Sequence, residues 1–294
     1  MESKESISSI SIKIKRFYSS IKDYKEGAPN TRYKSWEWCH EAFMEKKDEY
    51  LKADDNTQKS IVEYLALHLA FYLASWGMYR GSSFLLQRDY KTHKSAVKYI
   101  LEEKYKKLWD YNPNEDDDID ETTDLLFSEN EAELGIYYRI SSAYNFIKED
   151  KDTPTDTLIT KILMGTYGCV PAFDRFLKFG IAQYTKCIEK KINGIRLTQS
   201  INRNTFQALV HLAINQRGSL IIDNGEGVKY PPMKCLDMYF WEIGFEIDIA
   251  KGLIDNENDD TKKKALLTQA AQLNLCQYNL EYEDAYSEIM AKNE

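Results

Sequence analysis

Proline, glycine and paired cysteines are scarce in this chain of 294 residues. It has 6 prolines and 13 glycines, too few for turn-rich all-β folds or for collagen-like and linker sequences. Disulfide frameworks and zinc clusters need closely spaced, paired thiols. The five cysteines are scattered and form no Cys-x-x-Cys pair: Cys39, Cys169, Cys187, Cys235 and Cys276. These absences favour a protein of the reducing cytoplasm.

Long hydrophobic runs are also absent. The most apolar stretch, Tyr64–Met78, contains His68 and Ser75 and is shorter than the roughly 20 apolar residues that a membrane-spanning helix needs. It is therefore predicted to be a buried core helix. Residues 1–14 interleave charges with isoleucines, which does not fit the apolar region of a secretory signal. We expect a cytoplasmic protein with no membrane partner.

Sequence motifs of common enzymes are missing as well. The chain has no Gly-x-Gly-x-x-Gly, no P-loop, no His-Glu-x-x-His, no EF-hand loop and no Gly-x-Ser-x-Gly. Its four histidines lie far apart in sequence. Glu242 and Glu246 are one helical turn apart, but an ordinary solvated helix face explains them better than a metal site. The sequence thus predicts no metal and no cofactor, and leaves open whether the protein is an enzyme.

What the chain does contain is helical periodicity. Apolar residues recur every three or four positions, and one such stripe is Ile61, Leu65, Leu69, Leu73 and Trp76. Thr155 or Asp156 fits the N-cap of a helix that runs through Leu163. Aromatic residues make up 13% of the chain, enough to build a core. The predicted fold is an all-α, multi-helix globular protein.

An acidic stretch divides the predicted helices into two groups. Between residues 110 and 124, aspartate and glutamate follow one another so closely that they repel each other and bury nothing. We interpret 110–124 as a loop or linker. It separates an N-terminal helical subdomain, residues 1–109, from a C-terminal one, residues 125–294, with a cleft expected between them.

Positive charge is concentrated in one segment. Residues 161–217 contain nine basic and two acidic residues, a net charge of +7 within a chain of net charge −8. Such asymmetry is typical of a site for a phosphate-bearing partner. The residues predicted to bind nucleic acid are Arg175, Lys178, Lys186, Lys190, Arg196 and Arg203. The alternative is that acidic groups of the same protein, or of a protein complex, neutralise this segment.

A smaller anion site is predicted before the acidic stretch. A break in the helix near Gly77 and Gly81 would let Arg80, Ser82 and Ser83 surround an oxyanion; alternatively, the two glycines allow close helix packing. Lys91, Lys94 and Lys98 fall on one helical face nearby.

The segment from Thr160 to Asp174, TKILMGTYGCVPAFD, resembles a stretch in uncharacterised bacterial proteins related to the 8-oxoguanine DNA glycosylase fold of the helix-hairpin-helix superfamily. The shared outline is a Thr-Lys followed by aliphatic residues, a short loop, then Pro171 and Asp174 opening a helix. The resemblance implies an all-α protein that binds DNA and flips a base into a pocket. It makes Asp174 the active-site carboxylate and Lys161 the catalytic amine. Alternatively, Asp174 is a carboxylate favoured by a helix N-terminus.

Two functions from different classes are consistent with these observations. The first is a protein with a localised basic groove that binds nucleic acid or another polyanion, with base excision as its reaction if it is an enzyme. The second is a non-catalytic subunit that binds a protein partner in a bacterial defence assembly, such as phage defence, or a toxin-regulating assembly. A small-molecule enzyme that uses Arg80, Ser82 and Ser83 on a phosphorylated metabolite is a third. The first requires the cations of residues 161–217 to gather around one shared cleft.

Overall fold

The computed structural model describes residues 10–15, 17–18, 31–81, 83–109, 111–113, 119–144, 154–222, 229–255 and 258–262. Helices dominate these ranges, and the strands among them form one short hairpin. The prediction of an all-α protein is confirmed.

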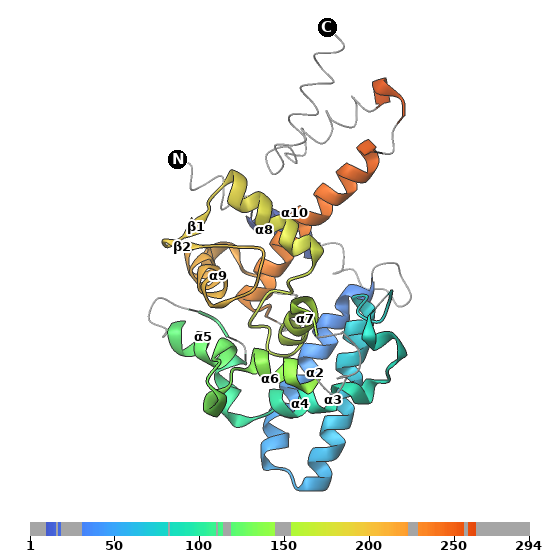
Figure 1. The fold of residues 1–294 in the computed structure, drawn as a ribbon, viewed down its shortest axis with the longest axis vertical. Coiled ribbons are helices and arrows are strands. Elements are labelled where there is room, and N and C mark those ends of the chain that lie inside the picture. The colour runs from blue at the N-terminus through green and yellow to red at the C-terminus, as the bar shows by residue number, and fades with distance from the viewer. Residues whose placement is uncertain are drawn as a thin grey trace.

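The first part of the chain forms a helical hairpin and a series of short helices around it (Figure 1). Two long antiparallel helices, α2 (Ser35–Lys52) and α3 (Asp55–Ser75), project at one end of the molecule. Residues 10–15 and 17–18 are also helical. The short elements are η1 (Thr31–Lys34), η2 (Phe84–Gln87), η3 (Tyr90–His93), α4 (Lys94–Ile100), η4 (Glu103–Leu108), α5 (Ile119–Phe127), η5 (Glu131–Glu133) and α6 (Ile136–Ala143).

The second part of the chain runs from the middle of the molecule to its other end (Figure 1). Helix α7 (Asp156–Thr166) lies centrally and contacts α2 and α3. Thr155 caps it, since its hydroxyl accepts a hydrogen bond from the Leu158 amide at 3.3 Å, as the sequence predicts. The remaining elements are α8 (Arg175–Cys187), β1 (Lys191–Ile192), β2 (Ile195–Arg196), α9 (Arg203–Asn215), η6 (Arg217–Ser219) and α10 (Pro232–Asp255).

Helix α3 ends where the sequence places a break. Gly77 adopts a φ of +75°, which a residue without a Cβ accommodates at no steric cost. The Met78 amide then donates to the Leu73 carbonyl at 2.9 Å, which closes the helix in a Schellman turn. The chain therefore turns away from α3 directly before the predicted anion site.

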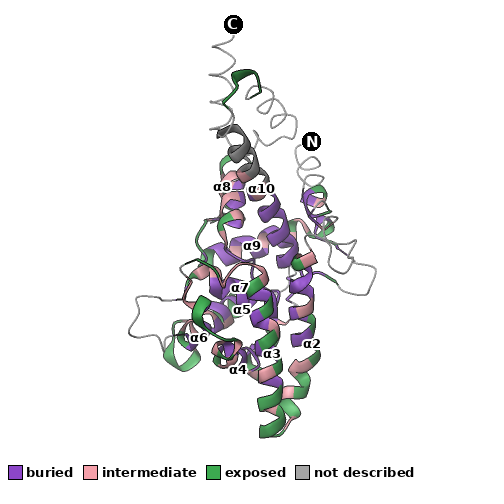
Figure 2. Cartoon of the chain, turned by 90° about the vertical axis from the view of Figure 1, so that its right-hand side faces the viewer, coloured by how far each residue is buried: buried purple, intermediate pink, exposed green. Residues whose placement is uncertain are grey.

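Part of the predicted acidic linker is helical. Residues 119–124 belong to α5, whose Leu126 and Phe127 are buried. The rest of the most acidic stretch, residues 110 and 114–118, lies outside the described residues. One continuous cluster of buried residues includes side chains from both predicted subdomains, from Ile10 to Ile243, and buried positions concentrate around α7 and the first half of α10 (Figure 2). The subdomain boundaries stay a prediction.

The tightest helix contact joins α8 to α10, and two glycines make it possible. A Cβ on Gly180 would lie 2.0 Å from the Phe240 carbonyl oxygen, and a Cβ on Gly244 would lie 2.0 Å from the Phe176 carbonyl oxygen. The contact is reciprocal because each helix carries the same Phe-x-x-x-Gly pattern, Phe176–Gly180 and Phe240–Gly244. This seam fixes which face of α8 points outward.

No helix in the described ranges is both long and apolar enough to span a membrane.

Candidate functional site

Helix α8 separates apolar and basic side chains onto opposite faces. Leu177, Gly180, Ile181 and Tyr184 are buried on the side that meets α10. Residues 175, 178, 182 and 186 recur at intervals of three and four on the other side, and three of them are the predicted cations Arg175, Lys178 and Lys186. Arg175 and Lys186 are exposed and Lys178 is half-buried.

The β-hairpin after α8 extends this row of cations. Its turn is Asn193-Gly194, both with positive φ (49° and 79°), which is the favoured sequence for a two-residue hairpin. The register places Lys191 directly opposite Arg196, and Lys190 precedes them. All three are exposed. Like charges directly opposite in a hairpin destabilise it, so the fold gains nothing from this pair.

We call Lys178, Lys186, Lys190, Lys191 and Arg196 the basic edge. None of the five has an ion-pair partner among the described residues. The sequence analysis counted Lys191 in the basic segment but did not select it as a binding residue. Its importance follows from its place opposite Arg196, which depends on the hairpin register.

Other cations of the basic segment are engaged within the protein. Arg175 contacts Asp248 at 2.9 Å, and Arg203 contacts Asp124 of α5 at 2.6 Å. Arg217 donates to the Pro113 carbonyl at 2.7 Å. Intramolecular charge complementarity, the alternative considered for this segment, accounts for these contacts. Arg203 therefore lies in a contact between α9 and α5, separate from the basic edge.

The two predicted catalytic residues lie side by side in the interior. Lys161 of α7 contacts Asp174 at 3.0 Å between Nζ and Oδ2, and their side chains are 4% and 16% exposed. The other oxygen of Asp174 accepts hydrogen bonds from the amides of Phe176 and Leu177, both at 3.1 Å. Asp174 is thus the N-cap of α8 and the counter-charge of Lys161 at once.

A second buried ion pair lies beside the first. Lys234 of α10 contacts Asp237 one turn later at 2.8 Å, and Asp237 also accepts a hydrogen bond from the Ala172 amide at 2.9 Å. Burial and the nearby Asp237 raise the pKa of the Tyr72 phenol well above its ordinary value. Sequence reasoning missed this pair; the signal was a Lys-x-x-Asp step inside an otherwise apolar helix.

Aromatic rings face both buried ammonium groups. The Lys161 Nζ lies 5.0 Å from the centre of the Trp76 ring, and the Lys234 Nζ lies 5.5 Å from the same ring. Lys234 also faces Phe17 and Trp36, at 5.6 and 5.4 Å. Such cation–π contacts partly replace the water that buried charges lose. We call the two ion pairs and these three rings the lysine–aromatic cluster.

One polar atom of this cluster has no partner. The indole N–H of Trp76 is buried and makes no hydrogen bond within the part of the chain that the structure describes. Buried donors are rarely left unsatisfied in native proteins. The Trp76 N–H is therefore an unsatisfied donor within the lysine–aromatic cluster.

All of the basic edge except Lys178 lies at the end of α8 opposite to the lysine–aromatic cluster. Asp174 caps its first turn and Lys186 stands in its last turn, so at 1.5 Å per residue the two are roughly 18 Å apart along the helix axis. The cations of residues 161–217 therefore do not converge on one concavity. The five cations of the basic edge instead follow the outer face of α8 from Lys178 to the hairpin, away from the buried Lys161.

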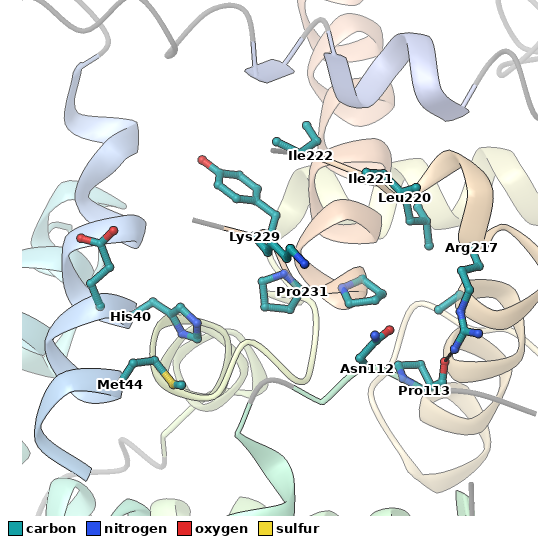
Figure 3. A pocket seen from close by; sticks show the side chains of 14 residues that line it. His40, Met44, Asn112, Pro113, Arg217, Leu220, Ile221, Ile222, Lys229 and Pro231 are labelled. Atoms are coloured by element: carbon teal, nitrogen blue, oxygen red, sulfur yellow. Dashed lines mark hydrogen bonds between the residues drawn. The ribbon is translucent and has the colours of Figure 1, made fainter. Parts of the chain in front are cut away.

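A separate pocket of about 730 Å³ opens between α2, η6 and the start of α10 (Figure 3). His40 and Met44 line one side, and Arg217, held by the Pro113 carbonyl, lines the other. The His40 Nδ1 lies 2.7 Å from the Thr166 carbonyl oxygen. The His40 ring stacks on Trp36, so this pocket shares a wall with the lysine–aromatic cluster.

The predicted anion site is described in part. Ser82 lies outside the described residues. Arg80 is exposed and folds back on Gly77, where a Cβ would lie 2.8 Å from its Nε atom. The Ser83 hydroxyl accepts a hydrogen bond from the Leu85 amide at 3.3 Å and so caps η2. Nothing lies within 4 Å of a Cβ on Gly81, so this glycine does not serve close helix packing. The anion site stays a prediction.

Thiol and metal chemistry find no support among the described residues. Burial raises the pKa of the Cys39 and Cys169 thiols far above the ordinary value, and that of Cys235 to about 12. Such thiols are inert as nucleophiles at neutral pH. The described side chains form no group of three or more metal-ligating residues.

Comparison of the chain with protein-family models, with curated proteins and with solved structures found no match. The geometry described above is therefore the basis for any functional assignment.

Proposed function

We propose that this protein binds the phosphate backbone of a nucleic acid along the basic edge of α8 and the β-hairpin. The observation that carries the proposal is the hairpin register, which sets Lys191 against Arg196. Two like charges in that position cost stability, and an anion bound between them would offset the cost.

The position of the other cations supports the same ligand. Lys178 and Lys186 lie on the face of α8 opposite the α10 contact, and Lys190 adjoins the hairpin. A row of single positive charges suits a repeating backbone anion better than a base edge. We therefore expect binding that depends on charge and shows little sequence preference.

Lys186 alone would not carry this proposal. It stands in the last turn of α8, where a cation stabilises the helix dipole. Lys191 and Arg196 have no comparable structural reason, which is why the experiment targets the hairpin.

The test is the salt dependence of oligonucleotide binding. If four cations of the edge contact phosphates, affinity for duplex DNA falls by about 10² between 50 and 200 mM salt. The variant with Lys190→Glu and Lys191→Glu should bind at least ten-fold more weakly, with a shallower salt slope.

The matched control is Lys52→Glu with Lys59→Glu, two exposed lysines on the projecting α2–α3 hairpin. The net charge changes equally in both double variants. Equal loss of binding in the two would contradict a localised edge, and unchanged binding by the hairpin variant would remove the proposal altogether.

The buried Lys161–Asp174 pair favours a second, catalytic function. A lysine next to a carboxylate at a helix start is the arrangement that the glycosylase resemblance implies, and the free Trp76 indole N–H could hold an acceptor atom of a flipped base. In this reaction the Lys161 Nζ would bond to the sugar C1′ as the C1′–N bond breaks. The electron pair would leave with the base, and Asp174 would pass the lysine proton to it.

Borohydride trapping tests this function separately from binding. Attack by lysine gives a Schiff base with the sugar, which borohydride reduces to a stable protein–DNA adduct. The parent chain should give an adduct with a duplex that contains a damaged base, and Lys161→Met should give none. No adduct and no base release with the parent on any lesion would restrict the function to binding.

A further inference from the structure

An exposed apolar stripe runs along the outer face of α3. Tyr64, Leu67 and Phe71 are 41%, 54% and 53% exposed, and they recur at intervals of three and four, so they lie on one face. The Trp38 ring of α2 stacks on Phe71 with a centroid distance of 6.0 Å. Adjoining exposed apolar side chains of this size mark interaction surfaces on soluble proteins.

The stripe contributes little to the packing of α3: only Phe71 among its three residues meets another helix in the described contacts, at the Trp38 ring of α2. The opposite face of the helix carries the buried residues Ile61, Leu65, Leu69 and Leu73, so α3 is amply held in the core without Tyr64, Leu67 and Phe71. Figure 2 shows exposed positions alternating with buried ones along this helix. In the described fold these three large apolar side chains thus remain about half exposed to water.

The two flanks of the stripe carry opposite charge. On the α2 side, Glu41, Glu45 and Glu49 follow Trp38 at helical spacing. Lys46, which contacts Glu45 and Glu49 at 3.3 and 2.9 Å, offsets part of this charge. Glu45 lies close enough to His68 of α3 to act on its charge, which places the acidic flank beside the stripe.

On the other side, η3 and α4 supply Lys91, Lys94 and Lys98. Lys94 contacts Glu63 of α3, one position before Tyr64, so this basic flank also adjoins the stripe. The α3 residues that locate the acidic and basic flanks, His68 and Glu63, are five positions apart, roughly 7.5 Å along the helix.

We propose that a second copy of this chain covers the stripe, with the two α3 helices parallel and related by a two-fold axis that runs along them. That rotation exchanges the two sides of the helix, so the acidic flank of each copy faces the basic flank of the other. It also makes every stripe residue meet its own counterpart. An antiparallel pairing would set like flanks against each other, and opposed like charges disfavour it.

Sedimentation over a range of concentrations tests the proposal, which does not depend on nucleic-acid binding. The parent chain should form dimers, and Leu67→Glu should raise the dissociation constant by about 100-fold, because each substitution occurs twice in a symmetric interface. Ile188→Glu, at another exposed apolar residue, is the matched control and should leave the dimer intact. A parent chain that stays monomeric throughout, or equal effects of the two variants, would overturn the proposal and leave the stripe to a different protein.

Orientation is tested with single cysteines at the two ends of the stripe. Ser60→Cys and Ala74→Cys are both exposed positions on the same face as Leu67. In the parallel dimer each variant cross-links with itself through a short bismaleimide, above the background of the parent chain. Cross-linking that requires Ser60→Cys mixed with Ala74→Cys would show the antiparallel arrangement and overturn the charge-matched one.

The charge complementarity of the two flanks is tested by reversing the charge of one residue on each flank. Glu45→Lys and Lys98→Glu should each weaken the dimer at least several-fold, and the chain that carries both should recover most of the affinity, because the flanks are complementary again. Failure of the double variant to recover, with helix content unchanged, would contradict the charge-matched pairing.

Discussion

Lysines of the same basic segment lie in opposite environments near the two ends of α8, one buried at its start and two exposed after its end. Lys161 is buried, paired with Asp174 and faced by the Trp76 ring. Lys190 and Lys191 are exposed, and Lys191 stands opposite another cation. Removing two charges from water is costly unless each is compensated, so the buried pair must match closely. The exposed cations are under no such constraint and remain available to a ligand.

The largest expected effect comes from breaking the buried pair. Asp174→Ala removes the counter-charge of Lys161 and the N-cap of α8 together, and should lower the free energy of unfolding by about 3–5 kcal/mol. Asp248→Ala, which removes the partner of the exposed Arg175, should cost less than about 1 kcal/mol. Denaturant titration of both variants is the measurement. Equal losses would mean that burial does not distinguish the two ion pairs.

His93 is also buried and ionisable, but unlike Lys161 it has no counter-charge among the described residues. His93 is buried, and its ring nitrogens lie 2.6 and 2.7 Å from the Tyr79 and Tyr144 hydroxyls. Burial lowers its pKa from 6.5 to about 3, so His93 is neutral when folded and takes up a proton on unfolding. Stability should therefore fall as the pH drops from 6.5 toward 3, by up to about 1.4 kcal/mol per pH unit from this group.

The variant His93→Gln removes that contribution. Its stability should change less between pH 6.5 and 5 than that of the parent, a range in which most carboxylates have not yet titrated. His211→Gln, at a half-buried histidine of α9, serves as the control. A parent-like pH slope in His93→Gln would refute the assignment.

The close contact between α8 and α10 positions both the buried Lys161–Asp174 pair and the basic edge. Gly180→Ala would force a methyl group against the Phe240 carbonyl oxygen and should destabilise the protein by about 1–3 kcal/mol. Helix propensity by itself predicts the opposite sign, a gain of about 1 kcal/mol. Gly218→Ala, where nothing lies within 4 Å of the added Cβ, should be near neutral. Thermal unfolding distinguishes these outcomes, and a stabilised Gly180→Ala would disprove the close contact.

The smallest expected effect is a gain in stability. Lys191→Glu converts the repulsive pair with Arg196 into an attractive one and should stabilise the protein by about 0.2–1 kcal/mol. The same change should weaken nucleic-acid binding. A loss of both stability and binding would indicate that Lys191 has a structural role, whereas a gain in stability with unchanged binding would exclude it from the interface.

Several local features were predictable from the sequence because they depend on neighbours along the chain. Thr155 at an N-cap, the break after Trp76 and the carboxylate of Asp174 at a helix start all follow from the four unpaired amides of a helix N-terminus or from the freedom of glycine at positive φ. The basic segment was visible as charge, but its division into paired and exposed cations was not.

The second ion pair, the free indole N–H of Trp76 and the reciprocal glycine contact escaped prediction for one reason. Lys234 and Asp237 are only three residues apart, but the surroundings of all three features come from residues distant in sequence: Ala172 donates to Asp237, Trp76 faces Lys161 and Lys234, and Gly180 meets Phe240. A pattern along one helix shows which face is apolar, but it does not show what that face meets.

By itself, the sequence determined an all-α protein, because helical periodicity and capping act over three or four residues. It also determined an excess of positive charge between residues 161 and 217. Tertiary structure alone decided that Lys161 is buried beside Asp174 while the basic edge stays in water. Burial depends on which distant helices cover a side chain, and the electrostatic cost of a charge depends on that burial.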